Sequence, residues 1–443
     1  MTPLRYLVHI SVFASLLLLL GASRPVGAQT DLQGEPFVRA TLGSLAYLLE
    51  SPPVSFASTA DSLLDSTLDL NKFADKAFGA YLEKTLDYYK KLLPEEDYRQ
   101  LLVQYRSQLH ASLRWRLIDD LALQLHREPL TAIRLESQHF EGEKGKVELI
   151  AEQSTGPISI RADLQRTQAG WRIVDISVDG RRLSAHYRKL CDNILDEKYS
   201  LAVLTSFLKR REYILLDDFS TTSPGQCPLD WVVWRPKDKK KPLHYQVVEE
   251  NGQHVMAARD SGSSVILAKS LRWNPRQYPI MTWCWKTTAL PPGGDERYNH
   301  TNDSAAGLYV VFSYNWFGAP KQLKYVWSST LPEGTVGKRD MIFRPWFFVL
   351  ESGEENLGRW TFETVDLEAH YKLKLGGKPD KKTDSVHILT DANSTKSYAE
   401  AYYADLRVWP REALEQGRVE NYCDCLNSGA DSAAPLRAAD GDF

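Results

Sequence analysis

The stretch from Lys146 to Val178, KVELIAEQSTGPISIRADLQRTQAGWRIVDISV, alternates apolar and polar residues in three short runs. These runs extend from Lys146 to Glu152, from Ile158 to Leu164 and from Trp171 to Val178. Alternation with a period of two is typical of half-buried strands, and short Gly-containing turns between the runs favour antiparallel neighbours. We therefore predict a small antiparallel sheet with one apolar face.

Helical periodicity precedes this sheet. Apolar residues recur at three- and four-residue spacing from Phe37 to Leu49, from Leu70 to Ala80, from Tyr81 to Leu93, and from Pro94 to about His126. An apolar sheet face needs a cover, and these helices can supply it. The first half is thus predicted as an α+β domain, residues 29–211, with helices around the sheet.

The first 28 residues have the pattern of a signal peptide. A basic residue, Arg5, precedes an apolar run from Tyr6 to Ala22, and small residues end at Ala28. A membrane anchor is the alternative, although the run is short for a bilayer span. We expect cleavage after Ala28 and a periplasmic location.

Charge and cysteine content narrow the class of protein. The chain has 54 Lys+Arg and 57 Asp+Glu residues, a balance that argues against nucleic acid as a partner. An oxidising compartment permits a disulfide among Cys227, Cys284, Cys423 and Cys425. The Cys423-Asp424-Cys425 motif lacks a second Cys/His pair for zinc, so a bridge to Cys227 or Cys284, or a tail feature, is favoured.

The segment Gly170-Trp171-Arg172-Ile173-Val174-Asp175-Ile176-Ser177-Val178-Asp179-Gly180, followed by Leu183 and Tyr187-Arg188, carries a resemblance. It is similar to the strand-turn-helix signature of the toluene-tolerance (MlaC) family of periplasmic phospholipid-binding proteins. The resemblance covers roughly residues 36–211. It implies a curved sheet and helices around an enclosed apolar pocket for phospholipid tails, and a membrane-associated transport complex as a partner.

This resemblance nominates residues for lipid contact. The candidates are the apolar residues of the strands and of the helical Phe78-Tyr81 region: Phe78, Tyr81, Val147, Leu149, Ile158, Ile160, Ala162, Val174, Ile176 and Val178. A filled core has the same pattern and is the alternative. Arg181 and Arg182 are candidates for a lipid head group, because Arg presents a planar fork of donors; a solvated basic pair is the alternative.

The second half is predicted to be an all-β sandwich of jelly-roll type, residues 217–411, with a tail from 412 to 443 that is partly disordered. Short apolar or alternating runs recur here between Gly, Pro, Asn and Asp residues. The half resembles an uncharacterised bacterial family through Asp217-Asp218-Phe219, Trp283-Cys284-Trp285, Asp303-Ser304-Ala305-Ala306, Tyr325-Val326-Trp327, Asp391-Ala392-Asn393 and Tyr403-Ala404-Asp405.

Three groups of residues in the second half could carry chemistry. Trp283 and Trp285 share a strand face and could stack on a sugar, although paired aromatics in a sandwich core are the alternative. Asp303 and Asp391 could act as a carboxylate pair in glycoside hydrolysis, or serve as ordinary turn residues. Carboxylates of Asp217, Asp218 and Asp405 could hold a structural calcium ion.

The sequence contains no phosphate-binding Gly loop, zinc-protease motif or hydrolase nucleophile elbow. We therefore predict no enzyme, no catalytic residues, no metal and no cofactor. The predicted function is periplasmic lipid binding and phospholipid transport, with the β-sandwich as a recognition module. The alternative is a carbohydrate- or cell-wall-binding module protein, and less favoured is a glycoside hydrolase.

Overall fold

The computed structural model describes residues 34–50, 53–234, 244–339 and 345–427. The expected signal peptide and the end of the expected tail lie outside these residues. The chain forms two compact units. Unit 1 consists of Met1–Lys84, Tyr105–Lys198 and Leu208–Arg210, and unit 2 consists of Thr85–Gln104, Tyr199–Phe207 and Arg211–Phe443.

The units are not divided at a single point of the chain. We expected the first domain to include everything up to Arg211, but the segments Thr85–Gln104 and Tyr199–Phe207 pack with the β-rich unit 2. Hydrogen bonds within unit 2 hold the first of these segments. The Tyr89 hydroxyl accepts from the Ser270 backbone N–H at 3.0 Å, and the Gln104 amide donates to the Thr221 carbonyl at 2.9 Å.

The helices begin where the sequence provides stabilising charges or caps. Asp69 caps α4 by accepting a hydrogen bond from the Lys72 backbone N–H, and three acids occupy the first turn of the long helix α6. The described helices of the first half of the chain are α2 (Glu35–Glu50), α3 (Pro53–Thr67), α4 (Leu70–Phe78), α5 (Tyr81–Lys90), α6 (Glu95–Arg127), α7 (Leu183–Leu190), α8 (Asp192–Asp196) and α9 (Leu201–Leu208).

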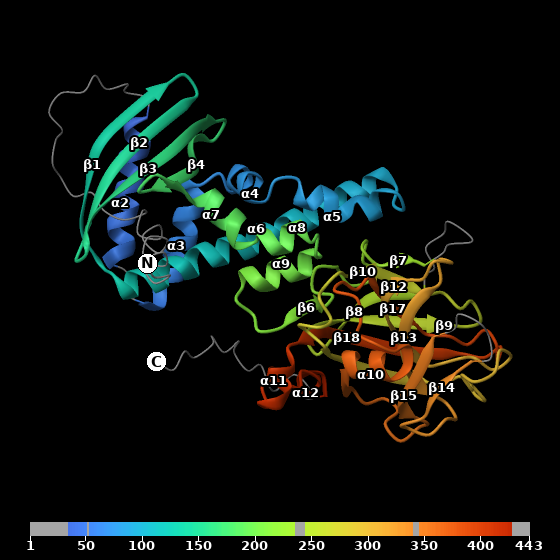
Figure 1. The fold of residues 1–443 in the computed structure, drawn as a ribbon. Helices are drawn as coiled ribbons and strands as arrows, with labels where there is room; N and C mark the ends of the chain where they lie inside the picture. The colour runs from blue at the N-terminus through green and yellow to red at the C-terminus, as the bar shows by residue number, and fades with distance from the viewer. Residues whose placement is uncertain (1–33, 51–52, 235–243, 340–344, 428–443) are drawn as a thin grey trace. The chain divides into compact units, whose positions relative to one another are not determined.

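Unit 1 contains a curved antiparallel sheet, seen in cyan and green in Figure 1. Its strands follow one another in chain order: β1 (Leu130–Glu141), β2 (Lys144–Gln153), β3 (Gly156–Thr167), β4 (Gly170–Val178) and the short β5 (Arg181–Arg182). The three predicted strands are present as β2, β3 and β4. Strand β1 was not predicted, because only Ile133 and Phe140 of this strand are buried and its residues do not alternate regularly.

Helices α3, α4 and α7 contact β4, and α4 packs against α7. A buried carboxylate joins this helix layer to the sheet. Asp175 of β4 accepts hydrogen bonds from the Ser184 hydroxyl at 2.8 Å and from Arg182 at 3.3 Å, and Lys76 of α4 lies 3.8 Å away. Tyr187 of α7 donates to Asp120 of α6 at 2.7 Å. These bonds fix α7 between the sheet and α6.

Unit 2 is a sandwich of two sheets. The seven-stranded sheet has the order β14 (Val336–Lys338), β15 (Trp346–Ser352), β13 (Pro320–Ser328), β12 (Ala306–Tyr314), β17 (Ser385–Leu389), β10 (Leu267–Ser270) and β7 (Val232–Val233). The facing sheet has the order β16 (Thr361–Asp366), β11 (Ile280–Ala289), β18 (Ala399–Trp409), β9 (Gln253–Asp260) and β8 (Tyr245–Glu250), and β6 (Ile214–Asp217) pairs with β18. This confirms the predicted β-sandwich.

Large aromatic side chains from both sheets fill the sandwich core. Trp283 and Trp285 of β11 meet Tyr325 and Trp327 of β13, with ring centroids 5.6 and 6.2 Å apart. Helices α10 (Leu367–Leu375), α11 (Arg411–Glu415) and α12 (Cys423–Asn427) complete the unit. None of the described helices has both the length and the apolar character needed to cross a membrane.

Candidate functional sites

The apolar face of the unit 1 sheet contains most of the residues predicted to contact lipid. Direct cross-strand partners place their side chains on the same face. Val147 pairs with Ala162, which pairs with Ile176, and Leu149 pairs with Ile160, which pairs with Val178. Ile158 pairs with Ala151 on the same face. All eight residues are buried.

A β-bulge changes the prediction at Val174. We expected Val174, Ile176 and Val178 to alternate on one face, but the register shifts beside Val174, and Ile173 is the residue that pairs with Leu164. Val174 is the extra residue of the bulge and lines a polar pocket with Lys76 and Asp163. Such an insertion breaks the period of two. On the apolar face of the sheet, Ile173 therefore takes the position that was predicted for Val174.

The helical candidates are also buried. Phe78 ends α4 and Tyr81 begins α5, and both side chains are almost fully removed from solvent. Gly79 between them has a φ of +57°, which favours glycine at this turn. Burial is consistent with a lipid wall and with a filled core, so these two residues do not separate the alternatives.

Unpartnered amides interrupt the apolar interior of unit 1. Gln124 of α6 is 1% exposed, yet neither its Oε1 nor its Nε2 atom has a hydrogen-bond partner among the described residues. Gln153 is on the apolar sheet face, two residues after Ala151; its Nε2 donates to the Glu128 carbonyl and its Oε1 has no partner. Buried polar atoms without partners are rare in native proteins and call for an explanation.

The two arginines predicted to contact a head group differ from that expectation. Arg182 forms ion pairs with Asp175 at 3.3 Å and Asp163 at 3.5 Å, while Arg181 is exposed on the short strand β5. Two carboxylates thus already engage the Arg182 guanidinium. Arg182 is thus held by carboxylates of the sheet and is not an unpaired donor for a phosphate.

A pocket of about 640 Å³ in unit 1 is polar. Its lining includes Lys76, Lys144, Lys146, Glu141 and Arg182. It is therefore not the enclosed apolar pocket that the family resemblance implies.

Unit 2 contains a pocket of about 510 Å³ on the outer face of the seven-stranded sheet. Its floor is a cross-strand row. Phe347 of β15 pairs with Lys324 of β13, Lys324 with Tyr309 of β12, and Tyr309 with His387 of β17. The pocket wall adds the aromatic rings of Trp234 and Phe317 and polar side chains from two loops: Glu296 and Asn302 between β11 and β12, and Asp391 between β17 and β18.

Hydrogen bonds hold the charged groups of this floor in place. Lys324 is 4% exposed, and its ammonium donates to the Ser304 hydroxyl at 2.9 Å. The Glu296 carboxylate, 1% exposed, accepts from Ser304 at 2.9 Å and from Ser328 at 2.7 Å. Burial raises the pKa of Glu296, although Lys324 partly offsets this effect. The result is a positioned ammonium–hydroxyl–carboxylate chain.

Two further titratable groups line the pocket. Burial, and then repulsion from Asp303, raises the pKa of Asp391 to about 6. Burial lowers the pKa of His387 to about 3, so its imidazole is neutral at physiological pH, and one ring nitrogen lies 2.9 Å from the Ser385 hydroxyl. The rings of Trp234 and Tyr309 lie 5.3 and 6.3 Å from His387, centroid to centroid. The pocket therefore combines fixed polar groups with aromatic faces.

The tryptophans predicted to bind glycan are not in this pocket. Trp283 and Trp285 are fully buried between the two sheets, with their rings 5.4 Å apart. Their shared strand face points into the core, because both sheets of the sandwich are apolar on that side. A glycan cannot reach them, and the core alternative is correct.

The predicted pair Asp303 and Asp391 is brought together, but with unequal roles. Asp303 is fully buried and accepts hydrogen bonds from the Ser394 backbone and from the Thr395 backbone and hydroxyl. It holds the turn after Asp391, and only Asp391 lines the pocket. The carboxylate of Asp303 thus stabilises this turn, as the turn alternative predicted.

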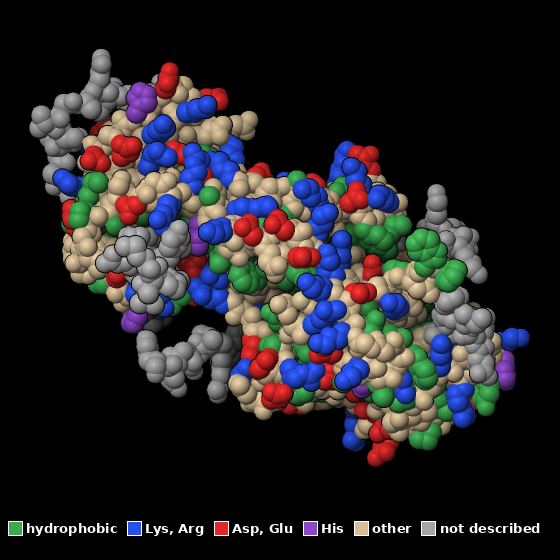
Figure 2. Space-filling model, in the orientation of Figure 1, with side chains coloured by type: hydrophobic (Ala, Val, Ile, Leu, Met, Phe, Trp, Pro, Cys, Tyr) green, Lys and Arg blue, Asp and Glu red, His purple; other side chains and the backbone are tan. Residues whose placement is uncertain are grey.

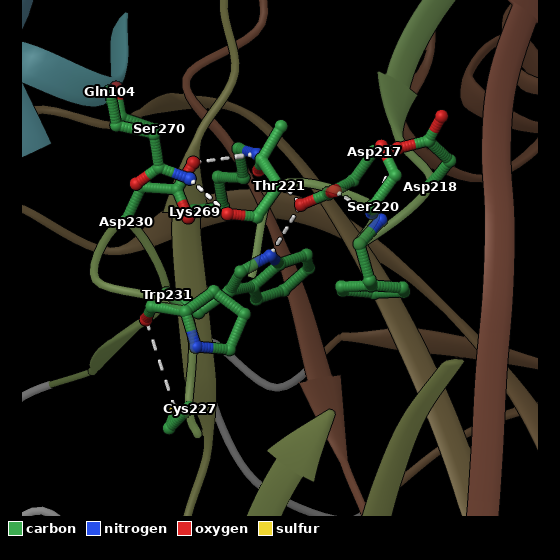
Figure 3. A network of polar contacts seen from close by, with 12 residues as sticks. Gln104, Asp217, Asp218, Ser220, Thr221, Cys227, Asp230, Trp231, Lys269 and Ser270 are labelled. Atoms are coloured by element: carbon green, nitrogen blue, oxygen red, sulfur yellow. Dashed lines mark hydrogen bonds and ion pairs between the residues drawn. The ribbon is translucent and has the colours of Figure 1, made fainter. Parts of the chain in front are cut away.

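The three aspartates considered for calcium are engaged elsewhere. Figure 3 shows Asp217 beside Lys269, whose ammonium lies 2.7 Å from both Asp217 and Asp230. Asp217 also accepts from the Trp231 indole at 2.7 Å. Asp218 accepts from Ser220, and Asp405 pairs with Arg407. Among the described residues no cluster of His, Cys, Asp and Glu fits a metal ion.

A disulfide joins Cys284 of β11 to Cys423 of α12, one of the two bridges that the sequence left open. Cys191 is a buried thiol and Cys425 an exposed one. The bridge holds the C-terminal helix against the outer face of the second sheet, where Cys284 and Cys423 pack with Trp360.

Among the residues of the unit 2 pocket, only Asp391 was predicted from the sequence. Lys324, His387 and Tyr309 alternate with core residues along their strands, which is also the pattern of a solvent-facing surface. A weak signal was available: Gln322 and Lys324, and likewise Ser385 and His387, put polar residues at every second position of neighbouring strands.

Charges of both signs are interspersed over the face of the molecule shown in Figure 2, as the overall balance of the sequence suggests.

Comparisons with known proteins bear mainly on the second half of the chain. A family described as a protein of unknown function (DUF3047) matches residues 230–407, in agreement with the predicted resemblance. The comparison gave no match to the toluene-tolerance family. No curated protein matches the chain in sequence.

Solved structures with similar folds include three of different kinds. A phospholipid-binding protein from Ralstonia solanacearum, in complex with a phospholipid, has 15% identity and a TM-score of 0.28, covering 41% of this chain and 97% of its own. A family 30 carbohydrate-binding module of a Clostridium thermocellum cellulase has 12% identity and a TM-score of 0.25, covering 43% and 95%. The glycoside hydrolase domain of Endo-D from Streptococcus pneumoniae has 11% identity and a TM-score of 0.20, covering 40% and 21%. What the comparisons establish is that residues 230–407 are similar to a family of unknown function.

Proposed function

We propose that the protein is an exported lipid-binding protein of the cell envelope, with unit 1 as the lipid carrier. The observation that carries this proposal is the amide of Gln124, which is 1% exposed and has no hydrogen-bond partner for either of its polar atoms among the described residues. Such a group would destabilise a filled core, because burying an amide without a hydrogen bond costs on the order of 1–3 kcal/mol. An amphipathic ligand has both a tail for the apolar face and ester oxygens for the amide.

The apolar row of β2, β3 and β4 supports the same proposal. Burying one methylene of an acyl chain contributes about 0.8 kcal/mol, so binding needs apolar area and no catalytic group. The resemblance of the Gly170–Gly180 segment to the phospholipid-binding family agrees with it. Export is supported by the signal-peptide pattern of residues 1–28 and by the disulfide between Cys284 and Cys423, since disulfides persist in oxidising compartments. A membrane transport complex as the partner follows from the resemblance.

The test uses the purified mature protein. Native mass spectrometry should detect co-purified phospholipid, and delipidated protein should take up a fluorescent phospholipid. In Gln124→Leu, we expect uptake to fall about tenfold while stability stays equal or rises, because Leu removes an unsatisfied amide. Leu123→Ala, an exposed position in the same turn of α6, is the matched control and should leave uptake unchanged. Protein that carries no lipid and takes none up would contradict the proposal.

A second candidate function, carbohydrate binding by unit 2, is favoured by the pocket on the seven-stranded sheet. Carbohydrate sites combine flat aromatic faces with fixed hydrogen-bonding groups. Tyr309, Trp234 and Phe317 provide the rings, and Lys324 and Asp391 provide positioned donors and acceptors. Binding on a glycan array that is lost in Asp391→Asn would support this function. Equal glycan-array signals from the parent protein and from Asp391→Asn would contradict carbohydrate binding in this pocket.

A further inference from the structure

The turn between β12 and β13 displays two large aromatic side chains to solvent. Trp316 is 97% exposed and Phe317 is 80% exposed. Soluble proteins bury most large aromatic rings, and a contiguous exposed apolar patch usually marks a binding surface. Both residues are therefore in need of a functional explanation.

The turn is well defined by its own hydrogen bonds. The Asn315 side-chain oxygen accepts from the Phe317 backbone N–H at 3.0 Å and from the Ala319 N–H at 2.9 Å. The Asn315 N–H donates to the Ala319 carbonyl at 2.8 Å, and the Gly318 N–H donates back to Asn315 at 2.9 Å. Gly318 has a φ of +73°, which this closure requires. A turn held in this way presents its rings with little conformational entropy to lose on binding.

The same turn borders the unit 2 pocket. Phe317, Gly318, Ala319 and Pro320 belong to the pocket lining, and the strand that follows contributes Lys324 to the floor. The exposed aromatic surface is thus continuous with a pocket whose polar groups are already positioned. A ligand that fills the pocket and extends beyond it on this side must pass Phe317, next to Trp316 in the chain.

We propose that this turn is a second subsite for a carbohydrate chain, so that the ligand of unit 2 is an oligo- or polysaccharide and not a free monosaccharide. One sugar unit occupies the pocket, and a following unit stacks its C–H face on the rings of the turn. The inference rests on the carbohydrate-binding candidate function. A membrane surface could also accept exposed aromatic side chains, but membrane binding would not explain the neighbouring pocket with its buried Lys324 and Asp391.

The experiment compares ligands of increasing length on the full mature protein. A glycan array with mono- to hexasaccharides identifies the sugar, and calorimetry then measures affinity against chain length. We expect the affinity to rise about tenfold or more once the chain exceeds one unit. Trp316→Ala should remove this gain and leave the affinity for the monosaccharide unchanged. Tyr298→Ala, another exposed aromatic outside the pocket lining, is the matched control and should behave like the parent protein.

The outcomes separate this proposal from the function on which it rests. If sugars bind in an Asp391-dependent manner but affinity does not depend on length or on Trp316, the second subsite is wrong and carbohydrate binding stands. If no glycan binds the parent protein, both are wrong. Sedimentation with phosphatidylethanolamine–phosphatidylglycerol vesicles tests membrane binding as the alternative. If Trp316→Ala abolishes vesicle binding and does not change the affinity for sugars, the turn is a membrane contact and the proposal is wrong.

Discussion

Lys324 and Tyr309 are direct cross-strand partners in β13 and β12, and the ammonium of Lys324 lies 5.4 Å from the centre of the Tyr309 ring. The same ammonium is linked through Ser304 to Glu296. One lysine therefore contacts an aromatic face of the pocket and compensates a buried carboxylate. This double role makes the pocket floor sensitive to single substitutions.

Replacing Lys324 with Met should destabilise the protein in a pH-dependent way. Glu296 loses its nearest cation, and its pKa, already raised by burial, rises further. A raised carboxyl pKa means that stability is lost as pH increases through that pKa. Urea unfolding should show a small loss at pH 5 and a loss of about 3–5 kcal/mol at pH 8. Lys321→Met, exposed on the same strand, is the control; equal losses at both pH values would contradict the assignment.

Asp391 gives a second pH prediction. Its pKa is about 6 in the folded protein against an ordinary value of 3.8, so folding favours the protonated form. The contribution of Asp391 to the free energy of unfolding is fully present below pH 4. It is lost as the pH rises through about 6, and the total loss is about 3 kcal/mol. Asp391→Asn should therefore stabilise the protein at pH 7.5 and not at pH 4.

Glu363, with a pKa raised by burial to about 7, is the matched control for Asp391 because it does not line the pocket. Glu363→Gln should change the pH dependence of stability in the same direction without changing ligand binding. Thermal unfolding across this pH range measures both variants. If the difference in stability between Asp391→Asn and the parent protein did not change with pH, the Asp391 carboxyl would have an ordinary pKa.

The ion pairs of Lys269 predict a strong effect on folding. Burial alone would lower the pKa of this lysine, but Asp217 and Asp230 outweigh it and raise the pKa. Lys269→Met leaves two buried carboxylates without their cation, which should reduce the free energy of unfolding by about 3–5 kcal/mol. Lys91→Met removes an exposed ion pair with Asp87 and should leave the free energy of unfolding nearly unchanged, because solvent screens such a pair. Similar values for the two variants in chemical denaturation would show that Lys269 is better solvated than the structure indicates.

The disulfide should stabilise unit 2 substantially. Cys284 and Cys423 are separated by 139 residues, and closing so long a loop in the unfolded chain is worth up to about 5 kcal/mol in the chain-entropy account. We expect Cys423→Ser, or reduction of the parent protein, to lower the melting temperature. Cys425→Ser keeps the bridge and should melt like the parent. An identical melting curve for Cys423→Ser would mean that the bridge does not form in solution.

Limited proteolysis tests how the units are built. Cleavage between Lys209 and Arg211 should produce two fragments that remain associated, because Thr85–Gln104 belongs to unit 2 although it precedes the cleavage site. The hydrogen bonds of Tyr89 and Gln104 hold this segment. Gel filtration of the nicked protein gives the answer. Separation into two stable, independently folding fragments would instead support a simple junction near Arg211.

The sequence by itself determined the local structure wherever burial follows a regular period. Alternation defined β2, β3 and β4, and three- and four-residue spacing with acids after Pro94 defined α6. The strand β1 has too few buried residues to alternate, and the bulge at Val174 shifts the register by one residue, which no local pattern reveals. Asp391 was found because its residue type suggested chemistry.

Only the tertiary structure decided which residues meet. The pocket floor joins β15, β13, β12 and β17, whose order in the sheet is not their order in the chain. Lys324 and His387 are 63 positions apart in the sequence, yet both are direct cross-strand partners of Tyr309. It also decided that Trp283 and Trp285 face the core and that Cys423 bonds to Cys284. The physical reason is that a period of two assigns residues to a face of a strand, whereas the neighbouring strands and loops decide whether that face is solvated, packed or hollow.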